Sequence, residues 1–372
     1  IQQVRIGLAF AYFNTKEFSK ANNLFKAYVD RLKATPNAKN NPTILIRLAD
    51  TYLISRKYQD ALTYYSQAAE LAKSEKDYAL YQKGMTLSYL NRDAEARQAF
   101  KQVRSNFPES KYAEDALYQE NLILFNGHNY KEAIAGFTDI IEAKTKSEFL
   151  ASAILKRAQA YTNTEQYELS LADYKRIINE FSGDKNAKDA LIGLQENLIK
   201  VGRPEEFGQV LENYQSATNA VEDAESMDLK YSAAKGIYDG KKFDKAIPAL
   251  KEFVAKYPTD ENAVEAYFLI ADAADQIKDS TEALQAYKKV IEQNAHPLVS
   301  KAILRAAELE NNAGNANEAV SLYRLHASKN PEVENQLNAY NNIFKAFYAA
   351  KQLDSVAKVF TEVEPLNLYS TE

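Results

Sequence analysis

The chain has 372 residues, of which 46% are hydrophobic and 26% charged, and its formal net charge is −5. This acidic balance argues against a nucleic-acid backbone as the main partner, because phosphate binding needs a basic face. With no cysteine there is no disulfide, no thiolate nucleophile and no Cys-ligated zinc site. Runs of aliphatic and aromatic residues, such as Leu122 to Phe125, are far shorter than the roughly 20 residues of a membrane span.

A small residue followed four places later by an aromatic recurs along the whole chain. Successive anchors, the first members of these pairs, lie 35 to 40 residues apart. A period in this range is typical of one supersecondary unit that is copied and stacked, so the sequence predicts a solenoid. Seven pairs fit the pattern: Ala21/Phe25, Ala61/Tyr65, Ala96/Phe100, Ala133/Phe137, Ser170/Tyr174, Ala283/Tyr287 and Ala319/Tyr323. In three further pairs one or both members differ: Phe207/Leu211, Ala246/Leu250 and Val356/Phe360.

Each unit contains two amphipathic helical stretches separated by a short polar turn. A small residue stands twelve places before most anchors, where two helices can approach closely. Asn121, Gln195 and Phe344 depart from this rule. An aromatic three places before several anchors, such as Phe18 or Tyr130, is expected to pack over the turn. The small positions are Ala9, Ala49, Gly84, Ala158, Ala234, Ala271 and Ala307.

Proline marks the end of three units, at Pro108, Pro258 and Pro331. Since proline disfavours the helical conformation of the residue before it, we expect the second helix to end there. The Asn- and Pro-rich stretch 34–43 is predicted to be a loop, and it accounts for the long first interval.

These features together resemble the tetratricopeptide repeat, and the resemblance covers essentially the whole chain. It implies an all-α fold: an α-α superhelix of about ten helical hairpins, right-handed, with a continuous groove. The segment "FPESKYAEDALYQENLILFNGHNYKEAIAGF" (107–137) further resembles tetratricopeptide repeats of bacterial cell-envelope proteins. That resemblance implies a periplasmic or cell-envelope location, with the cytoplasm as the alternative.

The pattern decays between Gly202 and Met227, which suggests three regions. We expect an N-terminal array over 1–201, a degenerate unit or joint over 202–227, and a C-terminal array over 228–372. A merely degenerate repeat without a joint is the alternative. The final stretch "LDSVAKVFTEVEPLNLY" lacks the polar outer face of a terminal cap. It suggests a fragment of a longer array, or an end covered by something else.

No catalytic, metal or cofactor site is indicated. The three histidines, His128, His296 and His326, lie in different repeats and none has a second His or Cys at ligand spacing. The sequence contains no HExxH, nucleophile elbow, phosphate-binding loop or dinucleotide fingerprint. We therefore expect a non-enzymatic protein without cofactors.

First-helix residues that face the inner groove of the family are the candidate binding residues. Exposed aromatic and Met side chains in a concavity suit peptide or helix capture; the alternative is that they fill the space between helices. The hypothesis is a scaffold that binds a protein or peptide. Two alternatives are the recruiting or regulatory arm of a larger enzyme, and a carbohydrate-binding module. The groove candidates are Tyr78, Tyr81, Met85, Tyr118, Leu122, Phe125, Tyr231, Tyr238 and Phe268.

Overall fold

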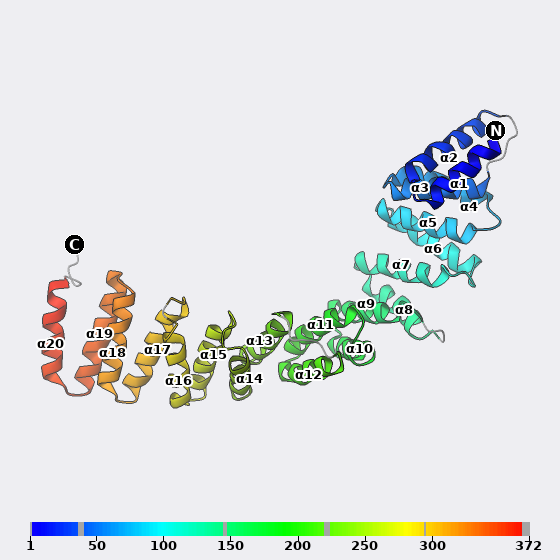
Figure 1. Ribbon diagram of the computed structural model, residues 1–372. Helices are drawn as coiled ribbons and strands as arrows, with labels where there is room; N and C mark the ends of the chain where they lie inside the picture. Colours follow the sequence, from blue (N-terminus) through cyan, green and yellow to red (C-terminus); the bar gives the residue numbers. More distant parts are fainter. Residues whose placement is uncertain (1, 36–40, 144–146, 219–223, 294, 367–372) are drawn as a thin grey trace. The chain divides into compact units, whose positions relative to one another are not determined.

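The computed structural model describes residues 2–35, 41–143, 147–218, 224–293 and 295–366, which contain 20 α-helices, two short 3-10 helices and no strand (Figure 1). The expected all-α fold of about ten hairpins is confirmed. Odd-numbered helices are the first helices of the hairpins: α1 Gln2–Asn14, α3 Pro42–Ile54, α5 Lys76–Tyr89, α7 Ala113–Asn126, α9 Leu150–Asn163, α11 Asn186–Lys200, α13 Ala224–Asp239, α15 Ala263–Gln276, α17 Leu298–Asn312 and α19 Val333–Ala349.

The second helices follow each turn: α2 Phe18–Lys33, α4 Tyr58–Leu71, α6 Asp93–Asn106, α8 Tyr130–Ile141, α10 Tyr167–Glu180, α12 Phe207–Thr218, α14 Phe243–Lys256, α16 Ser280–Ile291, α18 Ala316–Lys329 and α20 Leu353–Val363. The 3-10 helices are η1 Pro204–Glu206 and η2 Glu364–Leu366. Helices α6, α14 and α18 end two residues before Pro108, Pro258 and Pro331, as the proline positions predict.

The chain divides into two compact units, Ile1–Gly193 and Leu194–Glu372, with the division inside α11. Consecutive helices pack on one another from α1 to α10 in the first unit and from α13 to α20 in the second, and the core follows the repeat. The joint expected over 202–227 stays a prediction, and its residues 219–223 lie outside the described part of the chain. Residues 36–40 of the predicted first loop also lie outside it.

The small and aromatic pairs form the interior. In nine of the ten pairs both side chains are at most 3% exposed. Gly84 shows why the small position exists, since a Cβ there would lie 2.6 Å from the ring of Phe100. Only the last pair differs: Phe360 is 60% exposed, and no described α-helix follows α20 to cover it.

One departure from the small position is compensated by its neighbour. Asn121 is buried on α7, where seven of the ten units have Ala or Gly, and it packs on Gly136 of α8. A Cβ at Gly136 would lie 1.9 Å from the Asn121 Oδ1. The larger side chain on the first helix is therefore accommodated by the absence of one on the second.

A left-handed residue closes the first helix of every hairpin. Each of the ten turns holds one residue with φ between 56° and 83°, always five places before the anchor, and only Gly202 and Gly314 are glycines. The next amide donates to the carbonyl five residues earlier, as from Asp279 N to Ala274 O at 2.8 Å. This is the Schellman arrangement that satisfies the last carbonyls of a helix. The other eight are Lys16, Arg56, Asn91, His128, Glu165, Lys241, Lys278 and Lys351.

Candidate partner-binding surface

Six of the nine predicted groove residues lie on two neighbouring hairpins of the first unit. Helix α5 carries Tyr78, Tyr81 and Met85, and α7 carries Tyr118, Leu122 and Phe125. Spacings of three and four residues place each set on one side of its helix. Five of these side chains are half-buried, whereas Tyr81 is only 8% exposed. We call the five half-buried side chains the first-helix face: Tyr78, Met85, Tyr118, Leu122 and Phe125.

Tyr112 brings the two tyrosines of α5 together. The Tyr81 ring stacks on it at 5.2 Å between centroids, and the Tyr78 ring lies tilted at 5.4 Å. The Tyr81 hydroxyl donates to the Asp115 carboxylate of α7. Burial and this hydrogen bond raise the pKa of Tyr81, so the hydroxyl stays protonated. Tyr81 thus joins α5 to α7 and leaves little of its surface for a partner.

The α7 aromatics also contact the next hairpin. Tyr118 stacks on Phe149 at 5.0 Å between ring centroids. Phe125 meets Tyr130 edge-on at 5.5 Å, and the Lys156 Nζ lies 5.0 Å from the Phe125 centroid. Tyr118 and Phe125 are thus held by contacts within the protein and remain partly exposed, which favours recognition at low entropic cost.

A buried carboxylate fixes Tyr78. Asp50 is 5% exposed on α3 and accepts hydrogen bonds from the Tyr65 Oη at 2.6 Å and the Tyr78 Oη at 3.0 Å. Arg47 bridges Asp50 at 3.0 Å and Glu75 at 2.7 Å. Burial raises the pKa of Asp50, although its three hydrogen bonds oppose the change. The repeat pattern did not indicate this cluster, and its only signal in the sequence was an Asp next to the small residue Ala49.

The remaining three candidates lie in the second unit. Tyr231 and Phe268 are 7% and 5% exposed, and their rings pack on Phe253 and Tyr287. Tyr238 is half-buried and donates from its hydroxyl to Asp272 at 2.5 Å. Tyr231 and Phe268 therefore serve chiefly as interior contacts.

Charged side chains accompany these rings. Lys235 forms an ion pair with Glu265 at 2.7 Å and lies over the Tyr231 ring at 5.7 Å. Lys301 lies 4.9 Å from the centroid of Phe268. Cation–π contacts of this kind hold the two ammonium groups close to the Tyr231 and Phe268 rings.

The chemistry available elsewhere is limited. Within the described ranges no group of three or more His, Cys, Asp and Glu side chains is placed to hold a metal ion. Each histidine has a local partner: His128 pairs with the Tyr130 hydroxyl at 2.7 Å, His296 accepts from the Leu298 amide at 3.2 Å, and His326 lies 3.2 Å from the Ser300 hydroxyl. None of the helices that the structure describes is both long and apolar enough to cross a membrane.

Helical hairpins stacked with a period of 35 to 40 residues define an α-α solenoid, a class that presents extended surfaces for binding. Three family models described as tetratricopeptide repeat match residues 42–75, 78–110 and 231–297. The chain therefore belongs to the tetratricopeptide-repeat superfamily, whose repeats are generally protein-interaction modules. No curated protein sequence matches the chain.

Solved structures with similar folds come from several sources. The C-terminal part of a tetratricopeptide repeat-containing protein from Cytophaga hutchinsonii is 17% identical, with 80% of this chain and 98% of that chain covered and a TM-score of 0.45. MamA from Desulfovibrio magneticus RS-1 is 17% identical over 50% of this chain and 99% of its own, with a TM-score of 0.41. PilW, a type IV pilus biogenesis factor, is 19% identical over 61% and 98%, with a TM-score of 0.39.

Proposed function

We propose that this chain is a non-enzymatic scaffold that binds a protein or peptide segment on the first-helix face of its first unit. The observation that carries the proposal is the arrangement of five half-buried aromatic, Met and Leu side chains on two adjacent first helices. Such side chains offer large contact area and are enriched at the centres of interfaces.

The chemistry of the face supports a peptide ligand. Tyr78 and Tyr118 are preorganised by ring contacts, so their binding loses little side-chain freedom. Met85 and Leu122 add flexible apolar surface that can adapt to a partner side chain. The Lys156 ammonium beside Phe125 provides a charge at the edge of the face.

The test replaces Met85, Leu122 and Phe125 by Ala in one variant and measures binding of peptides selected on the wild-type chain from a display library of 16-residue segments. We expect binding to fall at least tenfold while the helical circular dichroism is kept. The matched control replaces Leu71 and Leu169, which are both 49% exposed on second helices, and should leave binding unchanged. Equal binding by all three proteins would refute the assignment of this face.

We further propose that the scaffold works in the bacterial cell envelope. The support is the resemblance of segment 107–137 to repeats of envelope proteins. Immunodetection of the native protein in fractionated cells provides the test. Recovery with periplasmic or envelope markers is expected, and recovery with cytosolic markers would overturn the location without affecting the binding proposal.

A further inference from the structure

A pocket of about 360 Å³ lies between the two helices of the first hairpin, α1 and α2. Its apolar lining includes the half-buried Ile6, Leu24 and Tyr28, and Gln2, Arg5 and Arg31 supply its polar groups. Pockets of this size, with an apolar lining and a few polar groups, are typical of sites for small ligands.

The two arginines lie at the same end of the pocket. Helices α1 and α2 pack on each other and are joined by a short turn, so the beginning of α1 lies beside the end of α2. Arg5 stands near the beginning of α1 and Arg31 near the end of α2, whereas Leu24 lies closer to the turn. The pocket is therefore amphipathic along its length.

The charge of these arginines is not neutralised within the part of the chain that the structure describes. No hydrogen bond or ion pair joins the Arg5 or the Arg31 guanidinium group to another residue of the described ranges, and no Asp or Glu lines the pocket. Both acidic residues of the hairpin, Glu17 and Asp30, already pair with lysines of α2, at 2.6 Å and 2.5 Å. Two cationic groups are thus available to a ligand.

The first hairpin is a basic region of an acidic chain. Residues 2–35 carry six Lys and Arg against two Asp and Glu, whereas the whole chain carries 46 against 51. A local excess of one charge raises the concentration of ligands of the opposite charge near it. The hairpin therefore attracts anions.

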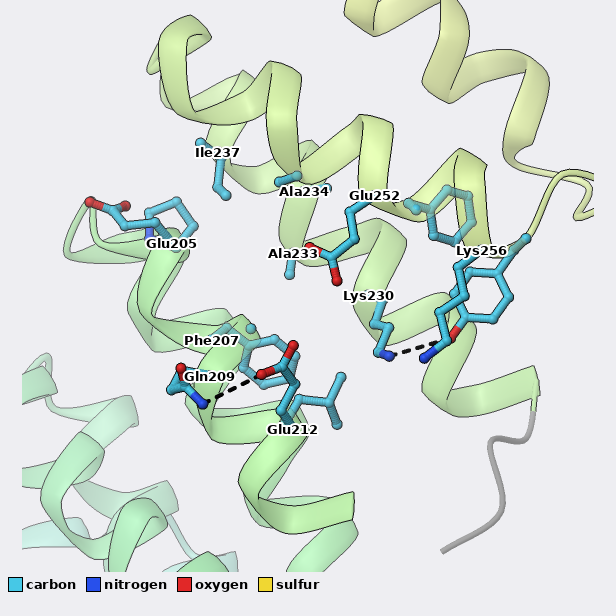
Figure 2. Close-up of a pocket in the computed structure, with 16 residues that line it drawn as sticks. Glu205, Phe207, Gln209, Glu212, Lys230, Ala233, Ala234, Ile237, Glu252 and Lys256 are labelled. Carbon is cyan, nitrogen blue, oxygen red and sulfur yellow. Dashed lines mark hydrogen bonds between the residues drawn. The ribbon is translucent and has the colours of Figure 1, made fainter. Parts of the chain in front are cut away.

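The pocket between α12 and α14, drawn in Figure 2, lacks this selectivity. It measures about 320 Å³, and Glu205, Glu212 and Glu252 line it together with Lys230 and Lys256. The Lys230 Nζ also has a hydrogen-bond partner within the protein. Because charges of both signs line this second pocket, it favours neither an anion nor a cation, unlike the α1–α2 pocket.

We propose that the α1–α2 pocket binds an amphiphilic anion, a molecule with one carboxylate or phosphate head group and a short apolar body. Guanidinium groups bind the oxygens of such head groups through paired, charge-assisted hydrogen bonds, so Arg5 and Arg31 hold the head group from two helices. The apolar body packs on Leu24 and Tyr28. Since an apolar cavity of about 150 Å³ holds one benzene, 360 Å³ accommodates the head group and a body of about eight carbons.

This site is separate from the first-helix face and does not depend on a protein partner. Octanoate and octyl phosphate are the probes, and isothermal titration calorimetry with the full chain measures their affinity below their micellar concentrations. We expect both to bind at least tenfold more tightly than octanol, which lacks the charge, and than acetate or inorganic phosphate, which lack the body. Binding should weaken as salt is raised.

Two variants test the two parts of the pocket. Arg5→Gln/Arg31→Gln removes the cations, and Ala27→Leu narrows the pocket from α2, where Ala27 is exposed and lines it. Each should weaken octyl phosphate binding at least tenfold while the helical circular dichroism is kept. The matched control is Lys16→Gln/Lys33→Gln, which removes the same charge from exposed side chains of the same hairpin outside the pocket lining and should leave binding unchanged.

Three results would overturn the site. They are equal binding by the wild type and the arginine variant, an equal loss in the lysine control, and octanol binding as tight as octanoate binding. The Met85, Leu122 and Phe125 variant should keep full octyl phosphate affinity, so failure of this pocket and failure of the first-helix face are distinguishable.

Cosedimentation with lipid vesicles separates the two sources of such an anion. Recruitment to phosphatidylglycerol vesicles but not to phosphatidylcholine vesicles, lost in Arg5→Gln/Arg31→Gln, would assign the site to an anionic membrane lipid. Octyl phosphate binding without recruitment to either vesicle would assign it to a free amphiphile.

Discussion

Lys278 closes α15 with a φ of 65°, a left-handed conformation in which the Cβ of an L-residue crowds the following carbonyl. This conformation costs roughly 1–2 kcal/mol for a residue with a side chain and nothing for glycine. Glycine in turn loses more backbone freedom on folding, by roughly 0.5–1 kcal/mol. Lys278→Gly is therefore expected to stabilise the fold by about 0.5–1 kcal/mol, since the Lys278 side chain is exposed and supports no core.

Equilibrium urea unfolding followed by far-ultraviolet circular dichroism measures the change. Two controls bracket it. Gly314→Ala should destabilise by about 0.5–1 kcal/mol, because Gly314 has a φ of 83° and a Cβ there meets nothing within 4 Å, so only the backbone strain and the smaller gain from removing a glycine set the cost. Lys288→Gly on α16 should destabilise by about 0.5–1 kcal/mol, because that lysine is helical and exposed.

A lower urea midpoint for Lys278→Gly, similar to that of Lys288→Gly, would show that left-handed strain does not limit the stability of these turns. The same test applies to the other seven non-glycine turns, where the conformation recurs.

Three further predictions concern packing and pH. Gly136→Ala should destabilise by about 1–3 kcal/mol because of the clash with Asn121, and a second change, Asn121→Ala, should restore much of the loss in the same urea assay. Burial by itself raises the pKa of Glu205, but the hydrogen bonds from Lys242 and Lys245 outweigh burial and lower the pKa to about 2. The stabilisation that Glu205 gives is therefore present above pH 4.5 and is lost as the pH falls toward 2. Because Glu205 and its two lysines lie at the surface, their interaction contributes under about 1 kcal/mol. Glu205→Gln should therefore make the free energy of unfolding depend less on pH below 4.5. Burial lowers the pKa of His326 below 6.5, so its stabilisation is present above pH 6.5 and declines below it; His326→Gln should reduce the slope of urea midpoint against pH between 7 and 5.

The repeat and its helices were predictable because they depend on local patterns. The prolines end helices by steric exclusion of the preceding residue, and the aromatics before the anchors pack over the turns, as Phe18 does on Phe13 at 5.5 Å. The left-handed turn residues gave no such signal, since eight of the ten are ordinary polar residues that the Schellman hydrogen bonds hold in place.

The position of the groove candidates on first helices was predictable from the sequence, but their exposure was not. Tyr81 and Tyr118 occupy first helices in the same way, yet Tyr81 is buried by Tyr112 and bound to Asp115, while Tyr118 keeps an exposed side.

The sequence by itself determined the order and inner side of the helices, because a small residue and an aromatic at a fixed spacing can be buried in only one register. Tertiary structure alone decided how far each aromatic side chain is exposed and how Gly136 accommodates Asn121. These depend on the distance between neighbouring helices, and that distance is set by side chains about 15 to 50 residues apart in the chain.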